Sequence, residues 1–263
     1  MKRVLITGGP TNEYIDEVMK ITNMSSGKIA IEMARHFVEG GDEVMLLLTK
    51  NIKSPLLDSM LDKSNFAVMR FETTEELLNN ITFLSTMTQY DIIIHSAAVA
   101  DYKPEFSFRA EDMAAEILGY IMRNQEALAE GFIKQEDVYD SLFEILTNPA
   151  CKVNDDTKIS SVEPNLTVKL GLTPKIIASL RKLFPNAFIA GFKLLENVPE
   201  EELVDAAMKQ IAKCKTNMCF ANDLAELRKG NAARLVVTPS GYKDVKVDGA
   251  YGIYNLLKIA TME

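Results

Sequence analysis

The chain has little of the material that metal centres and nucleic-acid surfaces use. Its 263 residues include two histidines and three cysteines, and the cysteines show no C-x-x-C or other metal-ligand spacing. The odd number of cysteines also argues against a disulfide framework, so a reducing cytoplasm is the simplest expectation. Lysine and arginine form no long block and the net charge is −8, which argues against a nucleic-acid surface or a basic membrane patch.

Long apolar runs are missing as well. No run is long enough to cross a bilayer, and the chain enters a strand-like segment almost at once, so we expect neither a membrane span nor a signal peptide. With only His36 and His95, a His-rich metal site or a Ser-His-Asp centre is not expected. His95 follows three isoleucines, and a core role explains it more readily than a functional one.

What the chain does have is an alternation of short apolar runs with helical patterns. With 47% hydrophobic residues it can bury a full core, and we predict one domain over residues 1–263. The alternation predicts an α/β fold with a Rossmann-like, mostly parallel sheet, crossover helices and a C-terminal β-hairpin. Residues 4–9 predict a buried strand followed by a tight turn at the glycines, and the further expected core strands are residues 43–48, 66–71, 91–94, 187–192 and 218–221.

Residues 104–156 interrupt this alternation. Two helical segments, 112–124 and 136–147, carry mixed charge and no strand signal, which predicts a helical insertion. Such a long connection is either a lid or a decorative insertion, and a lid is favoured because the segment leaves the ligand-binding edge of the sheet. After the insertion, residues 158–161 and 166–170 alternate apolar and polar, as half-exposed strands do.

A polar stretch, residues 23–28, precedes the first long helix. We predict Ser25 or Ser26 as its N-cap, so that outward N–H groups, hydroxyls and Lys28 form a phosphate cradle. An ordinary capped helix after a long loop explains the stretch equally well.

Small residues follow two of the predicted strands. Gly8 and Gly9 follow the first, and Ala97 and Ala98 follow the fourth. In open α/β sheets ligands bind beyond the carboxyl ends of the strands, so both turns lie at the functional edge. Small side chains there let a ligand approach the backbone, although they also suit tight packing between a helix and a strand.

Several motifs, in their order along the chain, resemble those of phosphopantothenoylcysteine synthetase, the second half of many bifunctional coenzyme A biosynthesis proteins. They are Gly-Gly-Pro-Thr at 8–11, Ile-Thr-Asn-Met-Ser-Ser-Gly-Lys at 21–28, Ala-Ala-Val-Ala-Asp-Tyr at 97–102, Lys-Ile-Ser-Ser at 158–161, Thr-Pro-Lys-Ile at 173–176, Gly-Phe at 191–192 and Ala-Asn-Asp at 221–223. Lys-Ile-Ser-Ser and Gly-Phe-Lys-Leu-Leu are similar to the stand-alone bacterial form, which has no flavin-dependent decarboxylase half.

The resemblance implies a ligase. A nucleotide, CTP rather than ATP, would activate the carboxylate of 4′-phosphopantothenate as an acyl-CMP and release pyrophosphate, and the amine of cysteine would then form the amide. The resemblance also implies Mg²⁺ held by the triphosphate, and a homodimer. It implies that Asn23 stabilises the acyl-nucleotide intermediate, and that Lys158, on a loop that closes over the site, binds the triphosphate.

Nucleotide contacts are implied for a larger set of residues. Lys209 and Lys213 lie one helical turn apart on one face, so both ammonium groups can reach the same phosphates, although a solvated lysine face is the alternative. The full set is Gly8, Gly9, Ser25, Ser26, Gly27, Lys28, Ala97, Ala98, Asp101, Phe192, Lys209 and Lys213.

The chain also departs from the family pattern. Met19 stands where the family has an arginine, and Thr173 and Lys175 replace an asparagine and an aspartate. These departures keep a non-catalytic homologue as one alternative, whereas the retained Asn23, Asp101 and Lys158 argue against it. A nicotinamide-dependent reductase is a second alternative, but no G-x-G-x-x-G opens a helix directly and no acidic residue ends the second strand.

Overall fold

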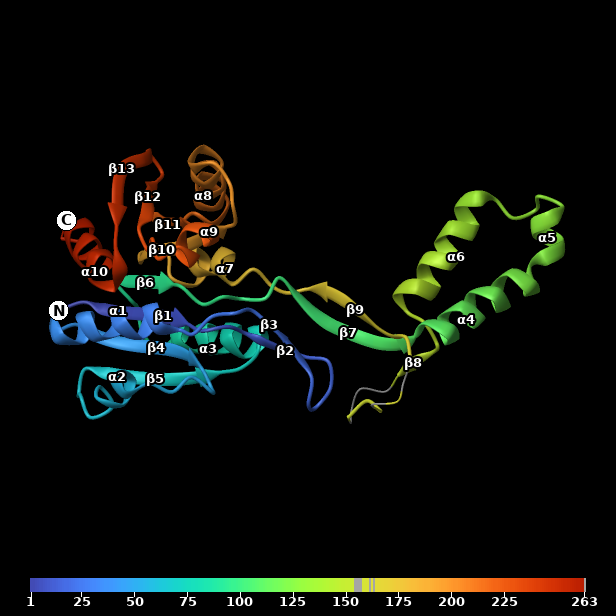
Figure 1. The fold of residues 1–263 in the computed structure, drawn as a ribbon, viewed down its shortest axis with the longest axis horizontal. Helices are drawn as coiled ribbons and strands as arrows, with labels where there is room; N and C mark the ends of the chain where they lie inside the picture. The colour runs from blue at the N-terminus through green and yellow to red at the C-terminus, as the bar shows by residue number, and fades with distance from the viewer. Residues whose placement is uncertain (154–157, 161, 163, 263) are drawn as a thin grey trace. The chain divides into compact units, whose positions relative to one another are not determined.

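The computed structural model describes residues 1–153, 158–160, 162 and 164–262, and its contacts divide the chain into two compact units. The first unit comprises residues 1–12, 22–101 and 174–263, and the second comprises residues 13–21 and 102–173. Figure 1 labels the helices and strands of both units. The predicted insertion, residues 104–156, falls within the second unit.

The first unit is built on one eight-stranded sheet in the order β13-β12-β11-β10-β6-β1-β4-β5. The six strands from β11 to β5 in this order are parallel, and the last hairpin adds two antiparallel strands. The predicted fold class is confirmed. The strands are β1 (Arg3–Gly8), β4 (Glu43–Thr49), β5 (Phe66–Phe71), β6 (Ile92–His95), β10 (Phe188–Leu195), β11 (Met218–Asp223), β12 (Arg234–Thr238) and β13 (Gly241–Val247).

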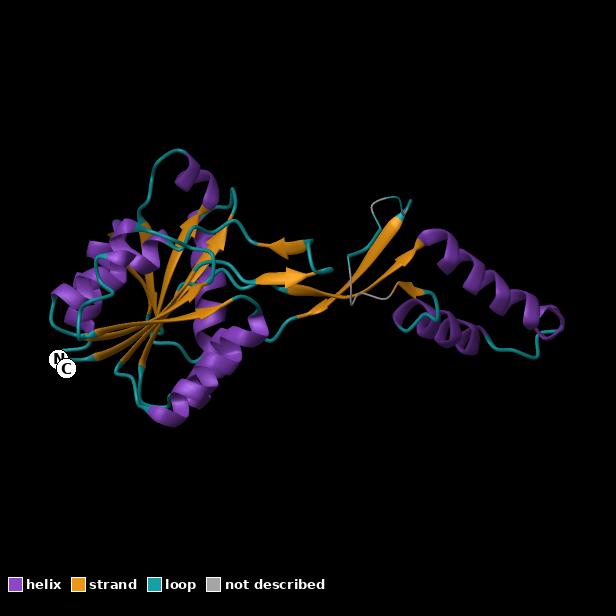
Figure 2. Cartoon of the chain, turned by 90° about the horizontal axis from the view of Figure 1, so that it is seen from below, coloured by secondary structure: helices purple, strands orange, loops and turns teal. Residues whose placement is uncertain are grey.

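Helices cover both faces of this sheet (Figure 2). One face packs on α1 (Lys28–Glu39) and α10 (Gly249–Ala260), and the other on α3 (Thr74–Met87), α7 (Ile176–Leu183) and α8 (Glu200–Cys214). The pleat of β6 shows how the sequence serves both faces. Ile92 and Ile94 enter the cluster beneath α1, whereas Ile93 enters the cluster beneath α3. All three are fully buried, each worth about 1.5–3 kcal/mol, so a continuous apolar run is what this strand requires.

Four short elements outside the insertion were not predicted from the sequence. They are α2 (Pro55–Asp58), α9 (Leu224–Arg228) and the pair β2 (Asn12–Tyr14) and β3 (Lys20–Thr22). These elements span one turn or a few residues, too few for hydrophobic periodicity to reveal.

The second unit joins a three-stranded sheet to a helical arm. Strand β7 (Tyr102–Arg109) lies between β8 (Lys152–Val153) and β9 (Leu166–Leu172) and pairs antiparallel with both. The arm follows β7 and contains α4 (Ala110–Arg123), α5 (Gln125–Ala129) and α6 (Gln135–Thr147). The two long helices of the insertion are therefore confirmed.

The predicted helical insertion, residues 104–156, also contains strands, because β7 extends into this range and β8 lies within it. β7 pairs with a segment far along the chain, a contact that local patterning does not reveal. Residues 158–160 form no strand, and Ser161 lies outside the described residues. Among the residues that the structure describes, we find no helix with both the length and the apolar character needed to cross a bilayer.

Candidate functional site

A cavity of about 530 Å³ opens in the first unit, where the chain leaves β6 and enters α7. Strand β10 and one side of α8 complete its wall. This is the carboxyl edge of the parallel strands, where ligands bind in open α/β sheets. The residues that carry the argument below are His95, Ala97, Asp101, Lys175, Phe192, Lys193, Lys209 and Lys213.

Cationic side chains outnumber acidic ones among the charged residues that line this cavity. Lys175, Lys193, Lys209 and Lys213 line it, and Asp101 supplies the one carboxylate among its lining residues. A positive cavity in a chain of net charge −8 is a local feature that composition alone does not reveal. Clustered ammonium groups in a concave site attract polyanions such as phosphates.

The two lysines of α8 behave as their spacing predicts, since both line the same cavity. Lys209 forms an ion pair with Asp205 at 2.7 Å, one turn earlier in the helix. The hydrogen bond from Lys209 to Asp205 and the charge of that carboxylate raise the pKa of Lys209, which therefore stays protonated at neutral pH. Lys213 forms no ion pair with any residue that the structure describes, so its charge is available to a ligand.

Asp101 and Lys175 form an ion pair at the entrance to α7. Both side chains are more than half exposed, so this pair contributes at most about 1 kcal/mol to stability. A phosphate-bearing ligand can therefore displace one partner at low cost. In the sequence, Lys175 stands out only as a departure from a family motif, and no local pattern indicates a role for Lys193.

Asn23 lies against the segment that follows β6. Its side-chain amide donates to the carbonyl oxygens of Ala98 and Val99, both at 3.1 Å. The backbone N–H of Ala98 donates in turn to the carbonyl of Gly9 at 2.9 Å. Asn23 thus joins the segment before α1 to the loop after β6, and Ala98 joins that loop to the one after β1. The carboxamide oxygen of Asn23 is left as an acceptor.

The beginning of α1 differs from the prediction. Its N-cap is Gly27, with φ at 69°, and no side chain caps the helix. The assignment of Ser25 or Ser26 as N-cap is therefore wrong. A Cβ at position 27 would lie 2.8 Å from Cδ1 of Ile52, and a positive φ favours glycine, so this turn requires Gly27. The backbone N–H of Lys28 donates to the hydroxyl of Ser26 at 3.4 Å, and that of Ala30 donates to the carbonyl of Gly27 at 3.1 Å. Of these first N–H groups, that of Ile29 has no acceptor among the described residues, and it lies beside Lys28 at the positive end of the helix.

The glycines after β1 are required by packing. A Cβ on Gly8 would lie 2.2 Å from the Cβ of Ala30 in α1, and Gly9 has φ at 84°. Tight packing, the alternative left open by the sequence, therefore explains both residues without a ligand.

His95 belongs to the core. It is 7% exposed, and its Nδ1 lies 2.9 Å from the hydroxyl of Thr7. Burial lowers the pKa of His95 to about 4, so the ring is neutral at physiological pH and adds no positive charge to the cavity that it borders.

In the second unit, Asp16 organises two segments that the sequence singled out. Its carboxylate accepts hydrogen bonds from the backbone of Met19 at 2.6 Å and Val18 at 2.7 Å, and from Ile159 at 3.0 Å. The bonds from Met19 and Val18 are the main causes that lower the pKa of Asp16, and the charge of Lys158 adds a smaller effect. Sequence analysis missed Asp16, because only the folded chain brings Met19 near Ile159.

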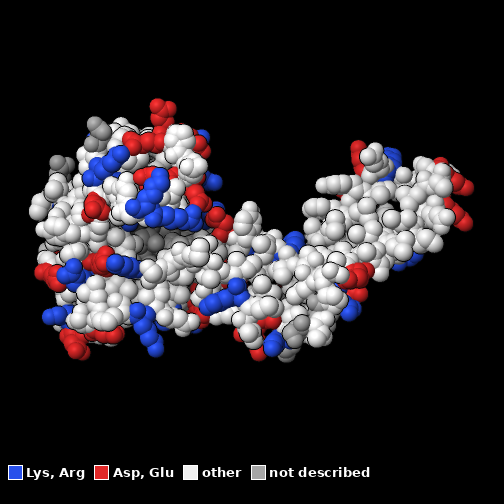
Figure 3. Space-filling view, in the orientation of Figure 1, with Lys and Arg blue, Asp and Glu red and all other residues white. Residues whose placement is uncertain are grey.

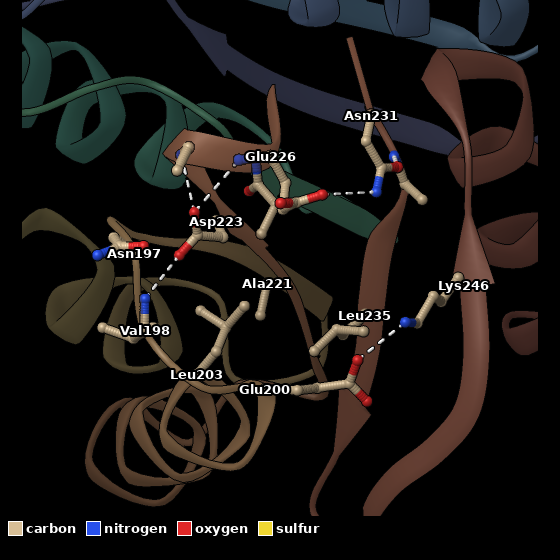
Figure 4. Close-up of a pocket in the computed structure, with 13 residues that line it drawn as sticks. Asn197, Val198, Glu200, Leu203, Ala221, Asp223, Glu226, Asn231, Leu235 and Lys246 are labelled. Atoms are coloured by element: carbon tan, nitrogen blue, oxygen red, sulfur yellow. Dashed lines mark hydrogen bonds and ion pairs between the residues drawn. The ribbon is translucent and has the colours of Figure 1, made fainter. Parts of the chain in front are cut away.

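A second cavity of the first unit, about 300 Å³, lies beyond the end of β11 (Figure 4). Its charged side chains all have partners within the protein. Asp223 accepts from the backbone of Val198 at 3.0 Å and of Ala225 at 2.7 Å, and Glu200 pairs with Lys246 at 2.8 Å.

One polar residue of this second cavity is an exception. Asn222 is 8% exposed, and its side chain forms no hydrogen bond with any residue that the structure describes. The signal in the sequence was a polar residue at the end of an apolar strand, within the Ala-Asn-Asp motif.

Comparisons with known proteins agree with this picture. A family model, the DNA/pantothenate metabolism flavoprotein C-terminal domain, matches residues 1–116. The coenzyme A biosynthesis bifunctional protein CoaBC of Thermococcus kodakarensis is 31% identical over 223 residues, which cover 85% of this chain and 41% of that protein. The chain thus spans well under two thirds of the length of such bifunctional relatives.

Solved structures extend the likeness to the whole chain. The DNA/pantothenate metabolism flavoprotein from Streptococcus pneumoniae superposes with a TM-score of 0.73 at 26% identity and covers 100% of both chains. A Cab2 mutant in complex with phosphopantothenate-cysteine shares the fold, with a TM-score of 0.65 at 17% identity over 98% of this chain and 85% of that one. Together these findings confirm the resemblance that the motifs indicated.

Proposed function

We propose that this chain, a homologue of the bifunctional coenzyme A biosynthesis proteins, is a ligase that joins 4′-phosphopantothenate to L-cysteine. The observation that carries the proposal is the four-lysine cavity at the carboxyl edge of the sheet. Lysines in such a cavity attract phosphate, and both 4′-phosphopantothenate and the nucleotide that activates it bear phosphate. The relative from Thermococcus kodakarensis is a coenzyme A biosynthesis bifunctional protein, and one structure with this fold holds phosphopantothenate-cysteine.

The reaction has two steps. A carboxylate oxygen of the acid attacks the α-phosphorus of a nucleoside triphosphate, CTP in our proposal, and pyrophosphate leaves. The amine of cysteine then attacks the acyl carbon of the acyl-CMP, loses a proton and displaces CMP. Neither step demands a strong protein base, so positioning and neutralisation of phosphate charge supply most of the rate enhancement.

The residues of the first unit suit these tasks. Lys209 and Lys213 would hold the phosphates from one side of the cavity, with Lys175 and Lys193 as further ammonium groups. Ala97, Ala98 and Asp101 would contact the nucleotide, and Phe192 would pack against it. Asn23 would stabilise the acyl-nucleotide while its amide keeps the two loops together. The N-terminus of α1, with Ser25, Ser26, Gly27 and Lys28, would add backbone donors for phosphate.

Mg²⁺ fits this site as a companion of the triphosphate. Among the described residues no group of three or more His, Cys, Asp or Glu side chains could hold a metal ion, and Asp101 is the one carboxylate lining the cavity. Magnesium is commonly bound by substrate phosphates and one or two carboxylates. When bound it would neutralise phosphate charge, and Asp101 would be its protein ligand.

Lys158 and a second copy of the chain complete the proposal. Lys158 would bind the triphosphate from its loop in the second unit. We also propose a homodimer, for which β13, an edge strand of the sheet, would need a cover. Lys20, next to Met19, would take the place of the family arginine, although the two side chains present different geometry.

The test is pyrophosphate release by the purified chain with 4′-phosphopantothenate and Mg²⁺. CTP and ATP are supplied in turn, with and without cysteine, and acyl-nucleotide is followed by mass spectrometry. We expect cysteine-dependent turnover with CTP. An acyl-nucleotide that accumulates and ignores cysteine would limit the activity to the first step, and no pyrophosphate with either nucleotide would contradict the proposal.

A further inference from the structure

The helical arm, residues 110–147, leaves large apolar side chains uncovered. Each of its two long helices carries a row spaced by three or four residues, which places the row on one side of the helix. The exposed fractions are 57% for Leu118, 42% for Ile121 and 61% for Met122 on α4, and 65% for Tyr139, 54% for Phe143 and 47% for Leu146 on α6.

Both rows face the same side of the arm. Ile117 and Leu142 are half-buried, and each precedes an exposed row by one residue, so these two residues belong to the faces that α4 and α6 turn toward each other. The helices run in opposite directions (Figure 1). Each step of one residue along a helix turns the side chain by about 100° around the helix axis, so each exposed row lies about 100° from the face that meets the other helix. Because the two helices are antiparallel, these rotations run in opposite senses in space, and both rows come to the same side of the pair.

We call this shared surface the arm face; it comprises Leu118, Ile121 and Met122 of α4 with Tyr139, Phe143 and Leu146 of α6. Its apolar side chains are grouped together, unlike the single exposed apolar residues that are common on protein surfaces. Met113 is the one buried residue among the three helices of the arm, so the arm has little core of its own. Figure 3 shows broad regions of the second unit without acidic or basic side chains. Contiguous apolar surface on this scale marks an interaction site.

The charge of the arm restricts what can cover it. Residues 110–147 contain nine carboxylates and two cationic residues, so they carry −7 of the net charge of −8. The acids of α4 have partners within the unit. Asp112 pairs with Arg109 at 2.6 Å, and Glu116 accepts from the backbone of Ala150 at 3.0 Å.

The acids of α6 are different. Glu136, Asp140 and Glu144 recur every four residues, and none forms an ion pair with a residue that the structure describes. Glu144 accepts one hydrogen bond, from the side-chain amide of Asn148 at 3.3 Å, which leaves its charge unneutralised. Asp140 and Glu144 each follow a residue of the apolar row, so this acidic row borders the arm face. An apolar surface with acids along one edge is complementary to a helix with an apolar stripe and a basic stripe.

We propose that the arm face docks a basic amphipathic helix of a partner protein. A second copy of this chain would fit the apolar rows, but it would bring two arms of charge −7 together, and like charges in an interface are costly. A basic helix instead buries the apolar rows and neutralises Glu136, Asp140 and Glu144 at once. This inference does not rest on the proposed ligase activity.

The experiment measures binding of a fluorescein-labelled helical peptide of about 18 residues to the full chain by fluorescence anisotropy. The peptide has leucines along one face and lysines along the adjoining one. Two controls have the same length, one with glutamate in place of lysine and one with the same composition in scrambled order. We expect the lysine peptide alone to bind, and more weakly as salt increases.

Matched variants distinguish an effect of the arm face on peptide binding from an effect of the net charge of the chain. Asp140→Lys with Glu144→Lys alters the edge of the arm face, and Glu126→Lys with Glu130→Lys makes the same change in net charge at the end of the arm. The first pair should weaken binding about tenfold, and the second by less than about threefold. Leu118→Ser with Phe143→Ser should also weaken it about tenfold.

Folding is monitored by circular dichroism, with Asp140→Asn and Glu144→Gln as a milder pair if the reversal disturbs α6. Equal weakening by the two charge reversals, binding of the scrambled or glutamate peptide, or no binding would each overturn the proposal. Analytical sedimentation provides one more test. If the wild-type chain sediments as a dimer and Phe143→Ser sediments as a monomer, a second copy occupies the arm face and the proposal is overturned.

Discussion

The cavity of the first unit and the arm of the second unit carry opposite charge. Four lysines and one aspartate line the cavity, whereas the arm holds nine carboxylates and two cationic residues. Net charge alone would describe this chain as simply acidic. The separation shows that a local charge pattern, placed by the fold, indicates the ligand of a site more directly than composition does.

The largest loss of activity is expected from a change at Asn23, which places a negative charge beside the proposed phosphate site. We expect Asn23→Asp to lower kcat by more than about 100-fold, because a carboxylate would repel the phosphorylated intermediate and lose the donors to Ala98 and Val99. Steady-state pyrophosphate release measures this, with circular dichroism to verify folding. Near-normal turnover would remove Asn23 from the mechanism.

A change of pH tests the neutral histidine beside the cavity. The pKa of His95 is about 4 in the folded chain, below its usual 6.5, so the unfolded chain binds more protons between these values. Stability should therefore fall as the pH falls through this window, by about 2 kcal/mol from pH 7 to pH 5. Urea unfolding at both pH values measures the difference. His95→Gln should reduce the pH dependence, and an unchanged slope would contradict this role.

Lysine substitutions sharpen the assignment of the cavity. Lys213→Gln should raise KM for the nucleotide about tenfold, because a charge-assisted phosphate contact is lost. Lys182→Gln, on α7 and outside the cavity lining, makes the same change in charge and should leave KM unchanged. Equal effects of the two variants would mean that overall charge, rather than the cavity, governs nucleotide use.

A substitution of Lys158 tests the triphosphate-binding role that we propose for the second unit. Lys158→Gln should weaken nucleotide use several-fold, measured as kcat/KM, less than the loss at Asn23. Glu126→Lys with Glu130→Lys, in the same unit, should leave kcat/KM unchanged. An unaltered nucleotide dependence in Lys158→Gln would contradict the loop assignment.

Local patterns in the sequence were sufficient for the sheet and for part of the site. The three isoleucines of β6 and the turn spacing of Lys209 and Lys213 report directly on burial and on a shared helix face. Ala97, Asp101 and Phe192 also reach the cavity that contains these lysines. Each of these predictions depended on a periodicity or a motif that lies within a few residues.

The remainder depended on contacts between distant segments. β7 is defined by its pairing with β9, and Asp16 by its bonds to both Met19 and Ile159. Gly27 became the N-cap of α1 because the backbone there has a positive φ and lies against Ile52, which no serine preference at N-caps can indicate. The sequence offers no local signal for any of these.

CTP binding, measured by isothermal titration calorimetry in the presence of Mg²⁺, tests whether the four-lysine cavity is the nucleotide site. The wild-type chain is compared with Lys209→Gln/Lys213→Gln and with the matched single variant Lys182→Gln. If the four-lysine cavity is the nucleotide site, the double variant should bind about 100-fold more weakly, while Lys182→Gln should bind as the wild type does. A double variant that binds CTP as tightly as the wild type would contradict the account.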